Sequence, residues 1–271
     1  MSAEISETER QALLSAAHAA ADAARKITLS YFRTDQLKAD NKAADGFDPV
    51  TKADREAEAA IRAVLNELRP QDSILGEELG EKTGGSGLTW VLDPIDGTRG
   101  FISGTPTWGT LISVRDESGP ILGLIDQPYI GERFIGGPDI AVLQTAAGNQ
   151  PLIVRPSASL AAATLFTTFP EVGTNNEGNA FRDLSAQVRL TRYGMDCYAY
   201  ALLAAGQIDL VVEAGLHAYD IQAPIAVIWA AGGLVTDWQG GPAHEGGRVI
   251  AAASAHLHSA ALEFLARAPM G

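Results

Sequence analysis

The segment that most restricts how this chain can fold is Trp90–Phe101, which reads WVLDPIDGTRGF. Its apolar first residues predict a buried strand, and Pro94 interrupts the hydrogen bonding of that strand directly after Asp93. Asp96 follows only three residues after Asp93, on the far side of the rigid turn. We therefore expect two carboxylates to converge on one small volume at the end of a buried strand.

The residues next to this pair indicate a site for a phosphate and metal ions. Gly97 and Thr98 are expected to begin a short helix, whose free N–H groups favour a phosphate. Crowded carboxylates repel one another unless protons or cations neutralise them, and all-oxygen ligands suit Mg²⁺ or Mn²⁺ rather than zinc. Two such ions, about 3.5–4 Å apart, promote in-line transfer of a phosphoryl group. Further carboxylates that are candidates to join the pair are Asp54, Glu77, Glu78 and Asp220.

The overall charge is compatible with this interpretation. The 271 residues include 20 Lys and Arg against 33 Asp and Glu, a formal net charge of −13. A protein of this sign repels the phosphates of nucleic acids, so we expect no nucleic-acid partner. Bound cations would supply the positive charge that an anionic small molecule requires.

Three further features predict a soluble, cytoplasmic protein with no membrane partner. Cys197 is the only cysteine, so an internal disulfide is impossible. The first residues lack the basic and apolar regions of a signal peptide. No apolar run approaches the roughly 20 residues that a membrane helix needs.

The first half of the chain begins with two helical patterns. Ser6 and Glu9 have the spacing of a capping box ahead of a helix that extends to Tyr31. A polar stretch over residues 36–48 predicts a loop, and a second helix follows it to Leu68. Short β-rich runs come next and predict an antiparallel sheet covered by the two helices. These runs cover residues 73–76, 88–92, 109–115, 121–126 and 132–136.

The second half alternates strand and helix signals, which predicts a separate α/β sheet. The expected strands cover residues 164–166, 188–190, 208–213, 234–237 and 249–252. The expected helices lie near residues 177–186, 196–205, 219–231 and 255–267. We therefore place an N-terminal α+β domain at residues 1–147 and a C-terminal α/β domain, which completes the metal and substrate site, at residues 148–271. Trp108 and Trp229 are expected in the core.

Four motifs together resemble the inositol monophosphatase-like superfamily of Mg²⁺-dependent phosphatases. They are DPVTKAD at 48–54, GEE at 76–78, DPIDGTRGF at 93–101 and the YDIQAP to AAGG region at 219–233. The stretches FISGTPTWGTLISV, GLIDQPYIGERFIGG and DCYAYALLAAGQIDLVVEAGL are most similar to the histidinol-phosphatase branch. The resemblance implies an αβαβα sandwich of the inositol monophosphatase and fructose-1,6-bisphosphatase type. It also implies a small phosphorylated metabolite as substrate and a homodimer.

The resemblance assigns the metal ligands, for two to three Mg²⁺ ions with Mn²⁺ as an alternative. A first ion would be held by Glu77, Asp93 and the carbonyl of Ile95. A second ion would be held by Asp93, Asp96 and Asp220. A third, weaker ion is expected near Glu77.

Other residues are implied to act on the water and the phosphate. The Thr98 hydroxyl would bind the attacking water, and Asp54, with Thr51 behind it, would help to orient that water. The amides of Gly97 and Thr98 would bind phosphate oxygens. Glu78 is expected to contact the residues that bind the ions without binding an ion itself.

The substrate depends on side chains outside the metal cluster. Histidinol phosphate carries an amine and an imidazole, both able to hold positive charge, whereas inositol is a neutral polyol. Asp196 and Glu213 are the candidates to contact those groups, since inositol-specific relatives usually have a small residue where Asp196 stands. Asp196 can alternatively be the N-cap of a helix. Arg99 and Arg192 are candidates to bind the phosphate or a carboxylate across a dimer, or to form surface ion pairs.

Three functions are compatible with these residues. The first is an Mg²⁺-dependent phosphomonoesterase that hydrolyses L-histidinol phosphate in histidine biosynthesis. The second is a phosphatase of inositol 1-phosphate or of a wider range of sugar phosphates. The third is an inactive scaffold that binds a phosphorylated ligand, because a fold alone does not establish catalysis.

Overall fold

The computed structural model describes residues 5–35, 37–41, 49–156 and 159–269. Its helices are α1 (Glu7–Tyr31), α2 (Lys52–Leu68), α3 (Thr98–Ser103), α4 (Asn175–Ser185), α5 (Cys197–Ala204), α6 (Ala218–Ala230) and α7 (Ala255–Leu265), with a 3₁₀ turn, η1 (Leu160–Ala162). Its strands up to residue 127 are β1 (Ala39–Asn41), β2 (Pro49–Thr51), β3 (Ser73–Gly76), β4 (Gly80–Lys82), β5 (Thr89–Asp96), β6 (Gly109–Asp116) and β7 (Gly119–Gln127). The later strands are β8 (Glu132–Gly137), β9 (Ile140–Thr145), β10 (Gly148–Pro151), β11 (Thr164–Thr167), β12 (Leu190–Tyr193), β13 (Leu210–His217), β14 (Leu234–Thr236) and β15 (Gly246–Ala252).

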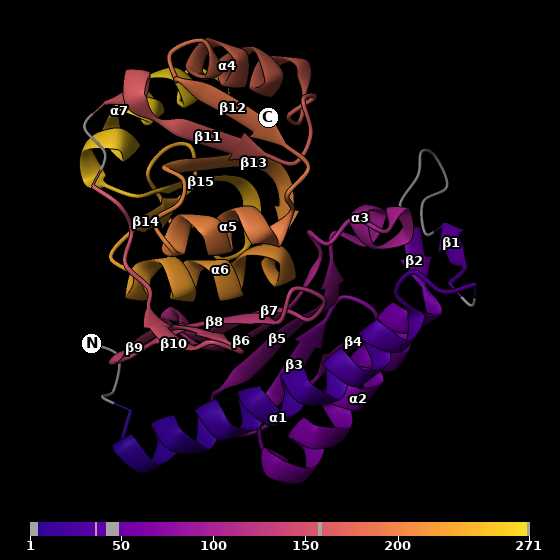
Figure 1. The fold of residues 1–271 in the computed structure, drawn as a ribbon. Helices are drawn as coiled ribbons and strands as arrows, with labels where there is room; N and C mark the ends of the chain where they lie inside the picture. The colour runs from indigo at the N-terminus through magenta and orange to yellow at the C-terminus, as the bar shows by residue number, and fades with distance from the viewer. Residues whose placement is uncertain (1–4, 36, 42–48, 157–158, 270–271) are drawn as a thin grey trace.

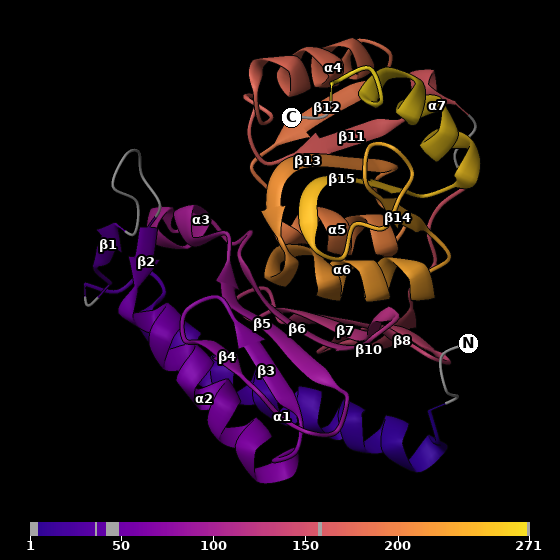
Figure 2. The ribbon, with the colours of Figure 1, turned by 180° about the vertical axis from the view of Figure 1, so that it is seen from behind.

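Layers of helices alternate with two large sheets, which is the predicted αβαβα sandwich (Figure 1). The first sheet has the order β10-β9-β8-β7-β6-β5-β3-β4, and the second has the order β12-β11-β13-β15-β14. Helices α1 and α2 cover the outer face of the first sheet, and α4 and α7 cover the outer face of the second (Figures 1 and 2). Helices α5 and α6 lie between the two sheets.

The N-terminal layer forms as the sequence predicts, except that the described structure shows one half of the capping box and the Glu9 carboxylate binds Arg69. The Glu9 N–H donates to Ser6 Oγ at 3.2 Å and caps the start of α1. The buried side of α1 is mostly alanine, with Leu13, and it packs against apolar residues of the sheet such as Trp90. The predicted antiparallel sheet is correct except for one pair, because β3 runs parallel to β5.

Helix α6 rests directly on the first sheet, and this contact positions the residues at its start. A Cβ atom on Gly123 of β7 would lie 2.3 Å from the carbonyl oxygen of Ala223. A Cβ atom on Gly136 of β8 would lie 2.3 Å from Val227 Cα. The missing side chains at these glycines therefore let the helix backbone touch the sheet, and the first turn of α6, with Asp220, lies at the end of β5.

Five short strands, β1, β2, β4, β9 and β10, were not predicted. The side chains of β1 and β10 are exposed throughout, so these strands lack the apolar alternation that reveals a strand in sequence. β1 lies inside the stretch predicted as a loop, whose positions 36 and 42–48 lie outside the described residues. β10 pairs with β9 in the first sheet, and the division of the chain after residue 147 stays a prediction.

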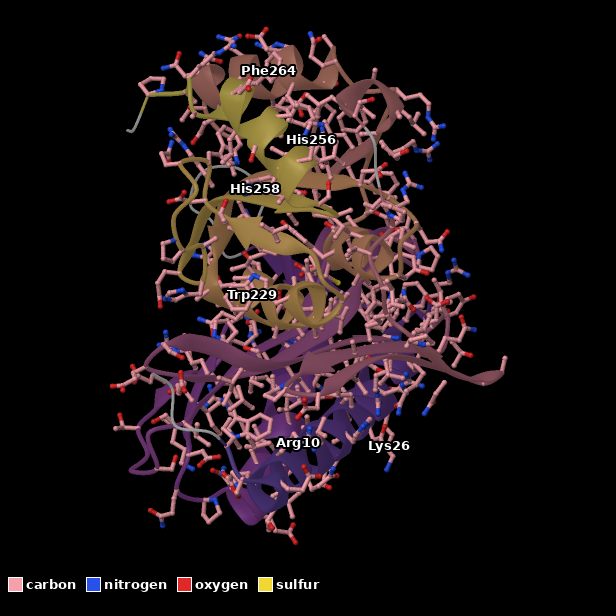
Figure 3. The ribbon with its side chains drawn as sticks, turned by 90° about the vertical axis from the view of Figure 1, so that its left-hand side faces the viewer. Arg10, Lys26, Trp229, His256, His258 and Phe264 are labelled. Atoms are coloured by element: carbon pink, nitrogen blue, oxygen red, sulfur yellow. The ribbon has the colours of Figure 1, made fainter. Side chains whose placement is uncertain are left out.

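The two tryptophans expected in the core differ. Trp108 is fully buried, but Trp229 is 48 % exposed. Trp229 lies near the end of α6, at the edge of the middle layer and turned toward solvent (Figure 3). The core prediction for Trp229 is therefore wrong, because an edge of this layer is not covered by either sheet. Among the described residues, no helix combines the length and the apolar character needed to cross a bilayer.

Candidate active site

The end of strand β5 turns two carboxylates in the same direction. Residues three apart on a regular strand point to opposite faces. The pairing of β5 with β6 is irregular between Asp93 and Asp96, and a bulge of this kind re-aims side chains. The Ile95 N–H donates to Asp93 Oδ1 at 3.0 Å, and the Cys197 N–H donates to Asp96 Oδ2 at 2.6 Å. These backbone hydrogen bonds hold both carboxylates in place.

Asp220 joins the pair from the first turn of α6. Each of Asp93, Asp96 and Asp220 offers a carboxylate oxygen that lies within 4.8 Å of the other two. Asp220 also accepts a hydrogen bond from the His217 N–H at 2.7 Å, which fixes it to the start of its own helix. The structure thus brings together three of the predicted metal ligands from two distant parts of the sequence.

The electrostatics of this cluster favour a cation. Burial raises the pKa of Asp93 well above its usual value, and the nearby charges of Glu77, Asp96 and Asp220 raise it further. Burial likewise raises the pKa of Asp96, and Asp196 and Asp220 add to this effect. The candidate ligand atoms are all carboxylate oxygens, and the carboxylates repel one another. These three residues therefore fit Mg²⁺ or Mn²⁺.

Glu77 and Glu78 lie in the tight turn between β3 and β4. The Glu77 N–H donates to the Leu92 carbonyl on β5 at 3.2 Å, so Glu77 is held beside the strand that carries Asp93. Glu77 lines the cleft, and its charge raises the pKa of Asp93. The Glu78 N–H turns away and donates to Glu58 Oε2 on α2 at 2.7 Å. The backbone N–H groups of the two neighbours therefore bind different elements, β5 for Glu77 and α2 for Glu78.

Thr51, Asp54 and Thr98 form a connected set. Asp54 Oδ2 accepts hydrogen bonds from the N–H and the hydroxyl of Thr51. The bond from the Thr51 N–H is one half of the capping box of α2, in which the Thr51 hydroxyl oxygen accepts from the Asp54 N–H. Asp54 Oδ1 lies 3.4 Å from the Thr98 hydroxyl, which is 3.1 Å from the Ile95 carbonyl oxygen. Burial raises the pKa of Asp54 to about 6, and the charge of Glu77 adds to this effect. The Thr98 hydroxyl therefore has two acceptors beside the carboxylate cluster.

A cleft of about 310 Å³ opens next to these groups. One side is formed by Gly97, Thr98 and Arg99 at the start of α3, where Gly97 has a φ of +82° that favours glycine. The opposite side comes from the C-terminal half of the chain. The residues there include Thr168, Phe169, Asp196, Tyr200 and Glu213.

Asp196 lies beside the start of α3. It occupies the N-cap position of α5, as the alternative interpretation predicted, but its side chain accepts no capping hydrogen bond from the described backbone. Its backbone has a φ of +46°, which is uncommon for a residue other than glycine. Backbone conformations of this kind occur most often at functional sites. A Cβ on Gly97 would lie 2.9 Å from Asp196 Cγ. Burial raises the pKa of Asp196 to about 6, although Arg99 and a hydrogen bond with Thr107 lower it.

Glu213 is a buried carboxylate on β13 that also faces the cleft. It accepts hydrogen bonds from the Thr168 N–H at 2.7 Å, the Thr168 hydroxyl at 2.9 Å and the Thr167 hydroxyl at 3.2 Å. Burial nevertheless raises the pKa of Glu213 to about 7, and the charge of Asp196 contributes. The structure thus places both predicted substrate-contacting carboxylates in one cleft.

The two predicted arginines have different positions. Arg99 lines the cleft, and its Cζ lies 4.9 Å from the ring centroid of Phe169. Arg192 is exposed on β12, the edge strand of the second sheet, and is not among the described residues that line the cleft. The predicted contacts of Arg192, with the phosphate or with a carboxylate across a dimer, stay predictions.

Sequence reasoning missed several residues of the cleft. Thr168 and Phe169 directly follow β11, and ligands of open α/β sheets bind beyond the carboxyl ends of their strands, so this position was a usable signal. Tyr200 lies one helical turn after Asp196, and its buried hydroxyl has no hydrogen-bond partner among the described residues. Thr107, which supports Asp196, had no signal in the sequence.

Comparison with known proteins gives consistent matches along the whole chain. The model of the "Inositol monophosphatase family" matches residues 9–268. The chain is 39 % identical to the "Bifunctional phosphatase IMPL2, chloroplastic" of Arabidopsis thaliana, over 97 % of this chain and 77 % of that protein. It is 34 % identical to a histidinol-phosphatase of Streptomyces coelicolor, over 92 % and 95 %. A solved structure of an inositol monophosphatase from Zymomonas mobilis has a TM-score of 0.84 and 39 % identity, and the match covers 96 % of this chain and 99 % of that one.

Proposed function

Since the chain belongs to the inositol monophosphatase family, whose members are phosphatases, we propose that it hydrolyses L-histidinol phosphate with Mg²⁺ as its cofactor. The observation that carries this choice is the pair Asp196 and Glu213. Both carboxylates face the cleft, and neither is needed to explain the metal cluster. A substrate with two groups that can hold positive charge matches such a pair better than a neutral polyol does.

The donor set fits the proposed metal ions. Glu77, Asp93 and the Ile95 carbonyl would hold one ion, Asp93, Asp96 and Asp220 a second, and Glu77 a third, weaker one. When bound, the ions supply positive charge to the phosphate and lower the pKa of a water molecule. Their charge would also relieve the repulsion that raises the pKa of Asp93 and Asp96.

The residues around the ions position the water and the phosphate. We propose that Thr98 accepts a hydrogen bond from the attacking water and donates its own proton to Asp54, which lies 3.4 Å away. The hydrogen bonds from Thr51 to the other oxygen of Asp54 keep this carboxylate fixed. The backbone N–H groups of Gly97 and Thr98 would bind phosphate oxygens at the start of α3. Positioning and charge supply most of the acceleration in phosphoryl transfer.

The other end of the substrate would lie between the two halves of the chain. Asp196 would bind the amine or the imidazole from the α5 side, and Glu213 would bind the second of these groups from β13. Hydrogen bonds to charged groups contribute about 1.5–3 kcal/mol each. A bound cation would also favour the ionised forms of both carboxylates, whose pKa values are about 6 and about 7 without it.

A second candidate substrate is inositol 1-phosphate or another sugar phosphate. It is favoured by the similarity to the Zymomonas mobilis protein, which is described as an inositol monophosphatase. The metal ligands and phosphate contacts proposed above would serve both substrates equally. The two candidates therefore differ only in what binds Asp196 and Glu213.

Phosphate release from three substrates separates these functions. We expect kcat/KM for L-histidinol phosphate to exceed that for inositol 1-phosphate and for fructose 1,6-bisphosphate by about 10-fold or more, which corresponds to one charged hydrogen bond. EDTA should abolish release, and added Mg²⁺ should restore it. Equal kcat/KM values would contradict the substrate choice. No EDTA-sensitive release from any substrate would favour an inactive scaffold. The proposed homodimer is tested separately by sedimentation equilibrium.

A further inference from the structure

Glu58 is a buried carboxylate that the proposed reaction does not use. It lies on α2 four residues after Asp54, and both side chains are buried on the same side of the helix. Glu58 is 0 % exposed, and Arg62 pairs with it through Nε at 2.7 Å. A carboxylate buried this completely requires several hydrogen bonds to offset the loss of water.

Among the described residues, the other hydrogen bonds of Glu58 come from the turn that presents Glu77. Glu58 Oε2 accepts from the Glu78 N–H at 2.7 Å, and Oε1 accepts from the Leu79 N–H at 3.2 Å. Arg62, which pairs with Glu58, also donates to the Gly80 carbonyl oxygen at the start of β4. The backbone that follows Glu77 is therefore bound to α2 at three consecutive residues.

Gly76, the residue before Glu77, has no side chain that would occupy the position of the Glu58 carboxylate. A Cβ atom on Gly76 would lie 2.0 Å from Glu58 Oε1, closer than two atoms can approach without a shift. Glu58 thus fills the space that the glycine leaves open. On the other side of the turn, the Glu77 N–H is bound to the Leu92 carbonyl of β5 at 3.2 Å. Glu77 is therefore fixed between β5 and the carboxylate of Glu58.

We propose that Glu58 is a positioning residue for the metal centre, which holds the turn 77–79 so that the Glu77 carboxylate is aimed at the ion beside Asp93. This inference rests on the proposed metal site. β4 has only three residues, and Leu79 in the turn is 47 % exposed, so the sheet alone secures this hairpin weakly. Groups that orient a metal ligand typically change metal affinity by about 10- to 100-fold when they are replaced.

The test is Glu58→Gln, which keeps the shape of the side chain but puts an NH₂ group against one of the three donors. We expect the dissociation constant for Mg²⁺, measured by isothermal titration calorimetry without substrate, to rise about 10-fold. The Mg²⁺ concentration for half-maximal phosphate release should rise by the same factor, with kcat at saturating Mg²⁺ close to that of the parent protein. A purely structural role would lower the melting temperature without moving either Mg²⁺ value.

Asp209→Asn is the matched control. Asp209 is also a buried carboxylate that accepts hydrogen bonds from an arginine and a backbone N–H, here Arg155 Nε at 2.8 Å and Thr164 N–H at 2.7 Å. It lies directly before β13 of the second sheet and is not among the described residues that line the cleft. This variant should lose stability and bind Mg²⁺ like the parent protein. If Glu58→Gln does not fold, Glu58→Asp keeps the charge, but it is too short to reach all three donors and should weaken Mg²⁺ binding in the same direction.

The outcomes separate this inference from the proposed function. A parent protein that binds Mg²⁺, with a folded Glu58 variant that binds it equally well, would overturn the role of Glu58 and leave the proposed function intact. A parent protein that does not bind Mg²⁺ would overturn both. Weaker Mg²⁺ binding in both the Glu58 and the Asp209 variants would show a general loss of rigidity and would also overturn the specific role of Glu58.

Discussion

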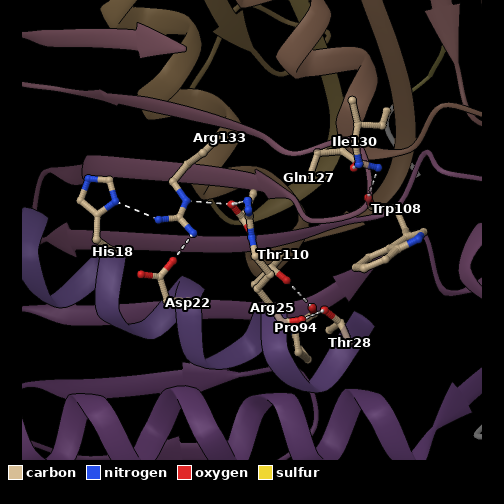
Figure 4. Close-up of polar contacts among 11 residues, drawn as sticks. His18, Asp22, Arg25, Thr28, Pro94, Trp108, Thr110, Gln127, Ile130 and Arg133 are labelled. Atoms are coloured by element: carbon tan, nitrogen blue, oxygen red, sulfur yellow. Dashed lines mark hydrogen bonds and ion pairs between the residues drawn. The ribbon is translucent and has the colours of Figure 1, made fainter. Parts of the chain in front are cut away.

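Buried carboxylates occur in two regions of this molecule with opposite surroundings. On the face of the first sheet that α1 covers, Asp126 is 0 % exposed and is bound by two arginines, Arg25 Nη2 at 2.6 Å and Arg133 Nε at 2.7 Å. Figure 4 shows Arg133 of this network with Asp22 and His18. Arg133 extends this network to Asp22 at 2.7 Å and to His18 Nδ1 at 3.0 Å, both on α1. The protein itself supplies the positive charge here, and the network ties α1 to β7 and β8.

In the cleft, Asp93 is almost as buried and Asp96 is half-buried, but the described residues provide neither with such a partner. Among the described residues, no lysine or arginine forms an ion pair with Asp93 or Asp96, and the pKa of each is raised. An uncompensated buried charge is costly, so a fold keeps several of them together only where a bound cation balances them. The difference distinguishes buried acids that arginines neutralise from those that support the proposed metal site.

The largest effect should come from removing one carboxylate of the cluster. Asp96→Asn takes away a proposed metal ligand but keeps the hydrogen bond to the Cys197 N–H. We expect kcat to fall about 10³-fold, since a metal ion contributes several kcal/mol to phosphoryl transfer, with little change in melting temperature. Steady-state kinetics at saturating Mg²⁺ and thermal unfolding measure the two quantities. A variant with near-normal kcat would show that Asp96 holds no catalytic ion.

The same kind of substitution at Asp126 should have the reverse result, a loss of stability with kcat retained. Asp126→Asn leaves two arginines without their common partner. Breaking a buried ion pair from one side costs about 3–5 kcal/mol, so the melting temperature should fall by about 10 °C. The kcat of the folded protein should be retained. A loss of activity with normal stability would contradict the division into structural and functional carboxylates.

A third prediction concerns the substrate side of the cleft. Asp196→Ala should lower kcat/KM for L-histidinol phosphate by about 10- to 100-fold, because a hydrogen bond to a charged group is lost. The value for inositol 1-phosphate should change little. Asp196→Asn is the matched variant, since it removes the charge and keeps the shape. Equal losses on both substrates would remove Asp196 from the specificity of the enzyme.

The smallest effect is a gain in stability from Glu213→Gln. The pKa of Glu213 is raised from 4.5 to about 7, so between these pH values the unfolded chain has released a proton that the native state keeps. The stability of the parent protein therefore falls as the pH rises through this range. The variant does not titrate and should be more stable by about 2 kcal/mol at pH 8 and by little at pH 5. Asp196 and Tyr200, which face Glu213 from α5, are unchanged in both proteins.

Glu177→Gln is the control with the opposite sign. Although burial raises the pKa of Glu177, hydrogen bonds from Thr174 and Arg248 lower it overall. Its charge therefore stabilises the native state above the unfolded pKa, and this contribution is lost as the pH falls. The Gln variant should be less stable than the parent protein at pH 8. Melting temperatures of the two variants at pH 5 and pH 8 should thus diverge, and a parallel response would contradict the comparison.

Much of the candidate metal centre was predictable because its signals are local. Pro94 between Asp93 and Asp96 imposes an interruption of the strand, and Asp54 lies three residues after its own capping partner, Thr51. Each of these features depends on a few neighbouring residues. The helices and the longer strands were predictable for the same reason, because the regular spacing of their apolar residues is visible in the sequence.

The sequence by itself determined the layered fold class and the carboxylates that gather at the end of β5. Only the tertiary structure decided that Asp196 faces Gly97, that Glu58 supports the turn of Glu77, and that Arg192 lies outside the cleft. The physical reason is that these contacts join residues far apart in sequence. They depend on how α6 and α2 pack against the first sheet, and no local pattern of residues records that packing.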